Sequence, residues 1–204
     1  MKTIVVNLYA GPGAGKTTSA WEIAARLKKE HINTEYVSEY AKELVWRNPN
    51  HKLLDGSVAS QTELFEVQNE RLSDLQGKVS VVVTDSPLLL NLMYVNEPAP
   101  ELEEMVFEAY GKYNNFNMFI KRGGEYERAG RLQTLEESVE IDNRIKELLN
   151  SRGIFCGEYD RDNIDVIVSN IQRSLKYNKD FSATKARTAK PKEKKTYRFH
   201  SQAR

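Results

Sequence analysis

The hydrophobic positions along the chain follow two different periods, and their alternation predicts strands separated by helices. A β-branched run at residues 3–8 ends in a glycine-rich turn, after which apolar residues recur at helical spacing up to Leu27. Similar patterns predict further strands at 34–38, 79–83, 118–120 and 153–156, and further helices ending at 46, 76, 110, 149 and 175. Strands that alternate with helices indicate an α/β fold, here a five-stranded parallel sheet with helices on both faces and sites at the carboxyl ends of the strands.

The length and charge of the chain indicate one folded domain and a separate basic end. With 204 residues of which 40% are hydrophobic, the chain can bury one sizeable core. From Ser182 to Arg204 eight Lys and Arg face the single Glu193, a local net charge of +7 within an overall +1, which leaves about −6 for the preceding residues. We therefore expect a domain at 1–178 and a basic, disordered tail at 179–204.

The cysteine count and the lack of long apolar runs help to predict the cellular compartment of the protein. A single cysteine, Cys156, excludes an internal disulfide framework, and no charged leader or membrane-spanning run is recognisable. We expect a soluble cytoplasmic protein without a membrane partner. The sequence does not predict its oligomeric state.

Residues 10–17 form the clearest motif of the chain. They read Ala-Gly-Pro-Gly-Ala-Gly-Lys-Thr, which matches the phosphate-loop pattern GxxxxGK[ST] except that Ala10 replaces the first glycine. Small residues let the backbone N–H groups curl around phosphate at a helix N-terminus, with Lys16 on the β- and γ-phosphates and Thr17 on Mg²⁺. The residues expected to bind ATP are Gly11, Pro12, Gly13, Ala14, Gly15, Lys16, Thr17 and Thr18. An ordinary glycine-rich turn is the alternative, and the loop alone does not separate a kinase from a switch or a motor.

Two carboxylates follow predicted strands and are candidates for the reaction itself. Asp85 ends the buried run 81–84, so it is expected at the carboxyl edge of the sheet as a second Mg²⁺ ligand; a helix cap near Pro87 is the alternative role. Glu39 closes the second strand and could accept the proton of an acceptor hydroxyl as general base, or it could be a solvated residue. Asp85 is the second candidate for the base.

The segment 121–131 is predicted to be a lid that closes on the transferred phosphate. It holds four cations and three glycines in eleven residues, and its arginines are Arg122, Arg128 and Arg131. A hinged loop that delivers guanidinium groups stabilises the charge of phosphoryl transfer and excludes water. A surface loop whose arginines pair with neighbouring glutamates is the alternative.

Two amides interrupt the apolar face of the helix predicted at 60–76. Gln61 and Gln68 could pair with the edge of a base, and Phe65 between them could stack on it. Solvent-facing amides at a helix edge are the alternative. These three residues are the candidate acceptor site together with Glu39.

With these motifs in place, residues 2–175 resemble the P-loop kinases of nucleosides and nucleotides. They are more closely similar to a small ATPase/kinase family that is common in bacterial viruses and related to ribosylnicotinamide kinases. The resemblance rests on the phosphate loop, Ser38-Glu39-Tyr40-Ala41-Lys42, Thr84-Asp85-Ser86-Pro87-Leu88 and Tyr126-Glu127-Arg128-Ala129-Gly130-Arg131. It implies a nucleoside-monophosphate-kinase-like fold, with Asp85 near Mg²⁺ and Arg122, Arg128 or Arg131 near the transferred phosphate.

The same resemblance extends to kinases that phosphorylate 5-hydroxymethyluracil in DNA, which would place the protein in a host cytoplasm. The basic tail would suit a DNA substrate, because Lys and Arg neutralise backbone phosphates whatever the sequence. The expected function is ATP-dependent phosphorylation of a hydroxyl on a small nucleoside or nucleotide, or on a 5-hydroxymethyl pyrimidine in DNA. A regulatory NTPase switch and a non-catalytic nucleic-acid-binding protein are the competing hypotheses, and the lid arginines with Glu39 favour the kinase.

Overall fold

The sheet predicted from the sequence is present as one five-stranded parallel sheet. The computed structural model describes residues 2–123 and 133–188, with side chains to residue 177. Neighbouring strands pair in the order β2-β3-β1-β4-β5. The strands are β1 (Ile4–Tyr9), β2 (Thr34–Val37), β3 (Val81–Thr84), β4 (Asn114–Ile120) and β5 (Gly157–Tyr159). The predicted α/β class and the parallel sheet are confirmed.

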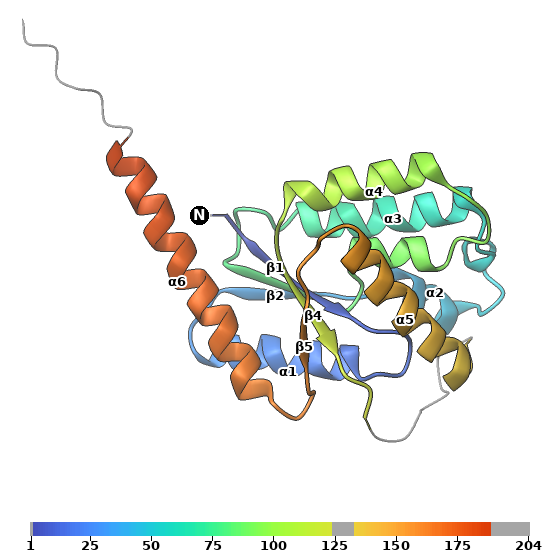
Figure 1. Cartoon of the computed structure of the whole chain (residues 1–204), viewed down its shortest axis with the longest axis horizontal. Coiled ribbons are helices and arrows are strands. Elements are labelled where there is room, and N and C mark those ends of the chain that lie inside the picture. Colours follow the sequence, from blue (N-terminus) through green and yellow to red (C-terminus); the bar gives the residue numbers. More distant parts are fainter. Residues whose placement is uncertain (1, 124–132, 189–204) are drawn as a thin grey trace, which may run out of the picture.

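Helices cover both faces of this sheet, as Figure 1 shows. They are α1 (Lys16–Lys29), α2 (Tyr40–Arg47), α3 (Val58–Ser73), α4 (Pro100–Lys112), α5 (Leu135–Ser151) and α6 (Ile164–Thr188), with short 3₁₀ turns η1 (Lys52–Leu54) and η2 (Leu88–Met93). One face packs against α1 and α6, and the other against α3, α4, α5 and η2. Two hydrophobic layers therefore enclose the central strands and hold their ends in place.

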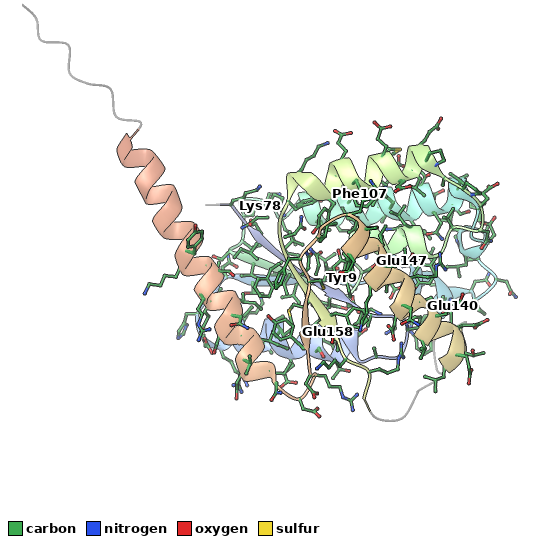
Figure 2. All side chains as sticks on the ribbon, viewed as in Figure 1. Tyr9, Lys78, Phe107, Glu140, Glu147 and Glu158 are labelled. Carbon is green, nitrogen blue, oxygen red and sulfur yellow. The ribbon has the colours of Figure 1, made fainter. Side chains whose placement is uncertain are left out.

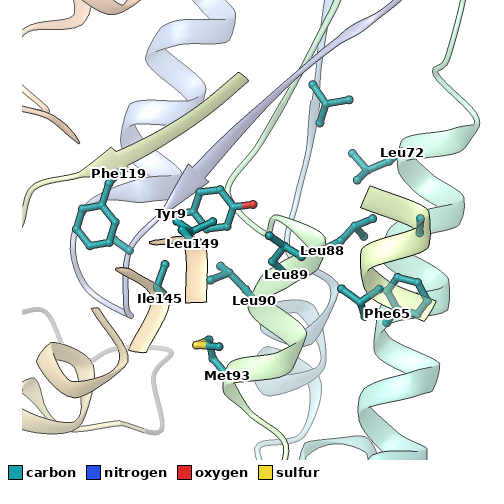
Figure 3. Packing of buried hydrophobic residues seen from close by; sticks show 14 of the residues in the cluster. Tyr9, Phe65, Leu72, Leu88, Leu89, Leu90, Met93, Phe119, Ile145 and Leu149 are labelled. Carbon is teal, nitrogen blue, oxygen red and sulfur yellow. The ribbon is translucent and has the colours of Figure 1, made fainter. Parts of the chain in front are cut away.

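The central strands are buried on both faces, which explains their continuous apolar sequences. Every residue of β1 and of β3 is buried. Tyr9 and Phe119 point into the layer that contains Ile145 and Leu149 of α5 (Figure 3). The carboxyl end of β1 is therefore fixed by packing before the phosphate loop begins.

The strand order brings three carboxyl ends together. Thr84 of β3 is in register with Asn7 of β1 on one side and with Val37 of β2 on the other. Residues that follow these strands share one edge of the sheet, where α/β proteins place their ligands. The strand that carries Asp85 neighbours the first strand, as the Mg²⁺ hypothesis requires.

The fifth strand was predicted in the wrong place. The prediction was 153–156, whereas β5 begins at Gly157, in register with Met118 of β4. The N–H of Ile154 donates to the carbonyl of Leu149 at 2.9 Å and closes α5. Phe155 is 85% exposed, so this apolar run is a turn that leaves the helix.

The end of the chain is described as far as residue 188. Helix α6 runs continuously from Ile164 to Thr188 and so crosses the domain boundary expected at 178. Residues 189–204 of the expected tail lie outside the described residues, and the division at 178 stays a prediction. Among the described helices, none has the length and apolar character needed to cross a membrane.

Candidate functional site

The phosphate loop joins β1 to α1 and has the backbone shape that its glycines allow. Gly13 and Gly15 have φ values of 79° and 90°, in the left-handed region that glycine adopts without a Cβ clash. Gly15 caps α1, so the N–H groups of its first turn face the loop. The loop therefore has the curled backbone at a helix N-terminus that binds phosphate.

Lys16 lies inside the loop. Its Nζ donates to the carbonyl oxygens of Ala10 at 2.7 Å and Gly11 at 3.1 Å. Burial lowers the pKa of Lys16, and the nearby carboxylates of Glu39 and Asp85 counteract part of that shift. The ammonium group is thus held against the loop backbone, close to both candidate catalytic carboxylates.

Asp85 and Thr17 meet where β3 ends beside the start of α1. The Thr17 hydroxyl donates to Oδ2 of Asp85 at 2.5 Å. Asp85 is 1% exposed, and its Oδ1 has no hydrogen-bond partner among the described residues. Tyr36 of β2 lies nearby, and burial, followed by the Asp85 carboxylate, raises the pKa of its phenol. A buried, unpaired carboxylate oxygen beside a hydroxyl fits a Mg²⁺ ligand pair, since Mg²⁺ takes one or two protein oxygens together with phosphate and water.

The segment after β2 supplies Glu39 and also Glu43, which forms an ion pair with Arg71 of α3. Glu39 is the residue that precedes α2, and it lines the same cavity as Lys16. Arg71 of α3 holds the carboxylate of Glu43 with two bonds of 2.8 and 3.0 Å, and Ser38 donates to it at 2.7 Å. This network fixes the turn between β2 and α2, and therefore the position of Glu39.

Gln68 belongs to that structural network. Its amide nitrogen donates to the Ser38 carbonyl at 3.2 Å, and its oxygen accepts from the Tyr40 N–H at 3.3 Å. Phe65 packs in the core beside Leu88 (Figure 3). Of the three residues suggested for base recognition, only Gln61 lines the cavity. The helical pattern correctly identified their shared face, but that face is largely used for packing.

Arg122 clamps the phosphate loop to α5. Its Nε and Nη2 donate to Asp142 at 3.0 and 2.8 Å, its Nη1 to the Pro12 carbonyl at 2.7 Å, and its Nη2 to the Ser138 carbonyl at 3.2 Å. The other oxygen of Asp142 accepts from the Gly11 N–H. Every nitrogen of this guanidinium group bonds to the protein, so Arg122 has a positioning role in this arrangement. The other two lid arginines, Arg128 and Arg131, lie outside the described residues.

A cavity of about 670 Å³ opens beside the phosphate loop. The loop contributes Pro12, Gly13, Gly15, Lys16, Thr17 and Thr18 to its wall. The helix α5 contributes Glu137, Glu140, Ile141 and Arg144, and Figure 2 shows Glu140 on that helix. The rest of the wall comes from α1, α2, α3, the 3₁₀ turns η1 and η2 with the residues after them, the residues that directly follow β2 and β3, and Gln133. The cavity is large enough for a second small molecule next to the bound phosphates.

Two residues of the site were missed from the sequence. Lys42 lines the cavity, and its Nζ lies 3.4 Å from the Thr17 hydroxyl, where it donates a hydrogen bond. Asp142 falls on the buried face of α5 with Ile141 and Ile145. An aspartate on the apolar face of a helix is rarely buried without a partner, so this position was a usable signal.

A family profile described as an AAA domain matches residues 5–165. Comparison with curated proteins finds no match. Similar solved structures include the Mycobacterium tuberculosis APS kinase CysC in complex with AMPPNP and APS, with 13% identity and a TM-score of 0.48, and a mutant of the same kinase, with 13% and 0.45. Both alignments cover 86% of this chain and 98% of the other. A further structure, APE1195, has 19% identity and a TM-score of 0.47 over 86% and 96% of the two chains. Since the family profile spans well over half of the sequence, the chain belongs to this AAA domain family.

Proposed function

We propose that the protein is a Mg²⁺-dependent kinase that transfers the γ-phosphate of ATP to a hydroxyl of a nucleoside-type acceptor. The observation that carries this proposal is the single cavity shared by Lys16, Thr17 and Glu39. A nucleotide switch needs only the phosphate loop. A kinase also needs room for an acceptor beside it, with a base within reach.

The residues divide the reaction between them. The loop N–H groups and Lys16 would bind the β- and γ-phosphates, and Thr17 and Asp85 would hold Mg²⁺. The metal ion, when bound, neutralises charge on the phosphate oxygens. The acceptor oxygen bonds to the γ-phosphorus while the bond to the β–γ bridging oxygen breaks, and ADP keeps that electron pair. Glu39 takes the hydroxyl proton, because Asp85 is already engaged with Thr17.

The sequence also predicted an acceptor hydroxyl on a modified base in DNA, as an alternative to a small nucleoside or nucleotide. The 5-hydroxymethyl pyrimidine, the viral origin and the DNA-binding tail all stay predictions. The charges of the described residues that line the cavity bear on whether the acceptor carries a phosphate group.

The test is transfer of label from γ-labelled ATP to a panel of hydroxyl compounds and to DNA that contains 5-hydroxymethyluracil. Lys16→Ala should abolish labelling, and Lys29→Ala, at the exposed end of the same helix, should leave it unchanged. Circular dichroism checks that both variants fold. Labelled free phosphate without any labelled acceptor would refute the kinase and favour a regulatory NTPase.

A further inference from the structure

Two of the three cations that line the cavity among the described residues lie at its phosphate-loop end. Lys16 is bonded to the loop carbonyls, and Lys42 lies against the Thr17 hydroxyl. Both lysines are placed to serve the triphosphate and the transferred phosphoryl group, and they are not placed to bind a second phosphate on the acceptor.

A second part of the wall, which we call the acceptor wall, comes from residues 54–64 and 90–96. It runs from the end of η1 into α3 and from η2 into the residues after it, and it includes Asp55, Gln61, Asn91 and Asn96 among its cavity-lining side chains. Both ranges are described completely, and neither contains Lys, Arg or His. A phosphate group placed here would have no cation of the wall to pair with, and it would lie near the negative charge of Asp55.

The polar side chains of the acceptor wall are neutral amides and one carboxylate. Asn91 donates one amide N–H to the Leu88 carbonyl at 3.0 Å, and Asn96 donates one to the Asp55 carbonyl at 2.8 Å. Each amide keeps its oxygen and a second N–H for a ligand. These amides can pair with the hydroxyl and N–H groups of a nucleoside, whereas the Asp55 carboxylate repels a phosphate group.

The third part of the wall, on α5, adds negative charge. Glu137 and Glu140 line the cavity with Arg144 as the single cation of that helix in the lining. Two carboxylates against one cation leave this part of the wall without an excess of positive charge for a polyanion such as DNA.

We infer that the acceptor is an unphosphorylated nucleoside-like compound, recognised through its hydroxyl and N–H groups, and that nucleoside monophosphates and DNA are rejected. The inference rests on the proposed kinase function and specifies its substrate class. The acceptor hydroxyl then receives the phosphoryl group, and the product leaves as a monophosphate.

The test compares nucleosides with their 5′-monophosphates in two assays on the full chain. Calorimetry measures binding of thymidine, uridine, cytidine, adenosine and 5-hydroxymethyl-2′-deoxyuridine, and of each 5′-monophosphate, without ATP. Labelled ATP then gives kcat/KM for each compound and for DNA that contains 5-hydroxymethyluracil. We expect at least one nucleoside to bind at least tenfold more tightly than its monophosphate and to be the preferred acceptor by about a hundredfold.

Two variants of the acceptor wall sharpen this comparison. Asn91→Lys places a cation in the wall and should narrow the preference for nucleoside over monophosphate by at least tenfold. Asn91→Gln keeps the wall neutral and should preserve the preference. A preference left unchanged by Asn91→Lys would count against the charge argument.

The experiment separates a failure of the inference about the acceptor from a failure of the proposed kinase function. A monophosphate or DNA that is bound and phosphorylated at least as well as the nucleoside overturns the inference and leaves the kinase intact. Binding of a nucleoside without transfer of label supports the inference about the wall and overturns the kinase. A panel in which no nucleoside binds overturns the inference.

Discussion

At the residue scale, the two oxygens of Asp85 have different surroundings. Oδ2 accepts from Thr17, while Oδ1 is buried without a partner among the described residues. A buried carboxylate with an open lone pair is unfavourable unless a cation completes it. This oxygen is the observation that supports the proposed role of Asp85 as a Mg²⁺ ligand.

Asp85→Asn removes the charge that Mg²⁺ needs and keeps the shape of the side chain. We expect the variant to bind ATP without Mg²⁺ as the unmodified protein does, but to lose most of the affinity that Mg²⁺ adds, by about tenfold. The turnover should fall by about 10² to 10³, the size of effect seen when one electrostatic group is removed. Calorimetry with and without Mg²⁺ is the measurement. Asp74→Asn, the same change at the exposed C-terminal end of α3, is the control, and an Asp85→Asn variant with unchanged Mg²⁺ dependence would contradict the assignment.

Glu43 gives a pH-dependent prediction at the same scale. The hydrogen bonds from Arg71, more than any other contact, lower its pKa from 4.5 to about 2. A carboxylate with a depressed folded-state pKa stabilises the protein above its unfolded pKa and loses that contribution as the pH falls through the folded value. Glu43→Gln should therefore cost about 1 kcal/mol at pH 7, a value reduced for solvent screening because the pair is about one-third exposed.

The unfolding free energy of the Glu43→Gln variant, measured with urea from pH 7 down to 2, checks this. The difference from the unmodified protein should shrink between pH 4.5 and 2 and vanish near the lower limit. A difference that stayed constant across this range would show that the ion pair is not its source.

At the element scale, the Arg122–Asp142 pair joins β4, the phosphate loop and α5. Its side chains are only 19% and 13% exposed, so leaving one charge alone is costly. We expect Arg122→Ala and Asp142→Ala each to destabilise the protein by about 3 kcal/mol and to raise KM for ATP about tenfold or more. The double variant should cost much less than the sum, since the two share one network.

The matched control is the exposed pair of Lys146 and Glu158, which also anchors α5. Its side chains are 44% and 48% exposed, and removing it should cost less than about 1 kcal/mol with no change in KM. Thermal unfolding and ATP kinetics on both cycles test the difference. Additive effects at Arg122 and Asp142 would refute the clamp.

Gly11 is required by the close approach of the phosphate loop to α5. A Cβ at this position would lie 2.2 Å from the Ser138 carbonyl oxygen, a backbone atom that cannot easily move. Gly11→Ala should therefore weaken ATP binding by at least tenfold and lower the unfolding temperature. In Gly111→Ala on α4 the new methyl meets open space, so that variant should gain about 0.5 to 1 kcal/mol. Equal behaviour of the two variants would contradict this packing.

The elements that could be predicted from the sequence were those that depend on a short stretch of neighbouring residues. The phosphate loop and the strand before Asp85 were predicted because a glycine pattern and a continuous apolar run are local signals. The fifth strand was misplaced because Phe155 is apolar yet exposed, and only pairing with β4 shows where the strand begins. The roles of Arg122 and Gln68 depend on partners distant in the sequence, Asp142 and Ser38, so composition suggested a lid and a base reader instead.

At the scale of the whole molecule, the site is assembled within residues 7–144, while α6 closes the far side of the sheet. The buried residues of α6 extend to Leu175, and the basic tail follows them. Deleting residues 189–204 should therefore leave the unfolding temperature and phosphorylation of a small acceptor unchanged within about twofold. Thermal scans and steady-state rates on the truncated chain check this, and a larger loss would show that the tail belongs to the site.

In the proposed kinase, ATP cleavage is coupled to phosphorylation of an acceptor hydroxyl. Phosphorus NMR of the protein with ATP, Mg²⁺ and a nucleoside follows ADP, free phosphate and phosphomonoester in one sample. We expect one phosphomonoester for each ADP, with little free phosphate, and loss of both products in Lys16→Ala. ADP and free phosphate in equal amounts, at a rate indifferent to the nucleoside, would contradict it.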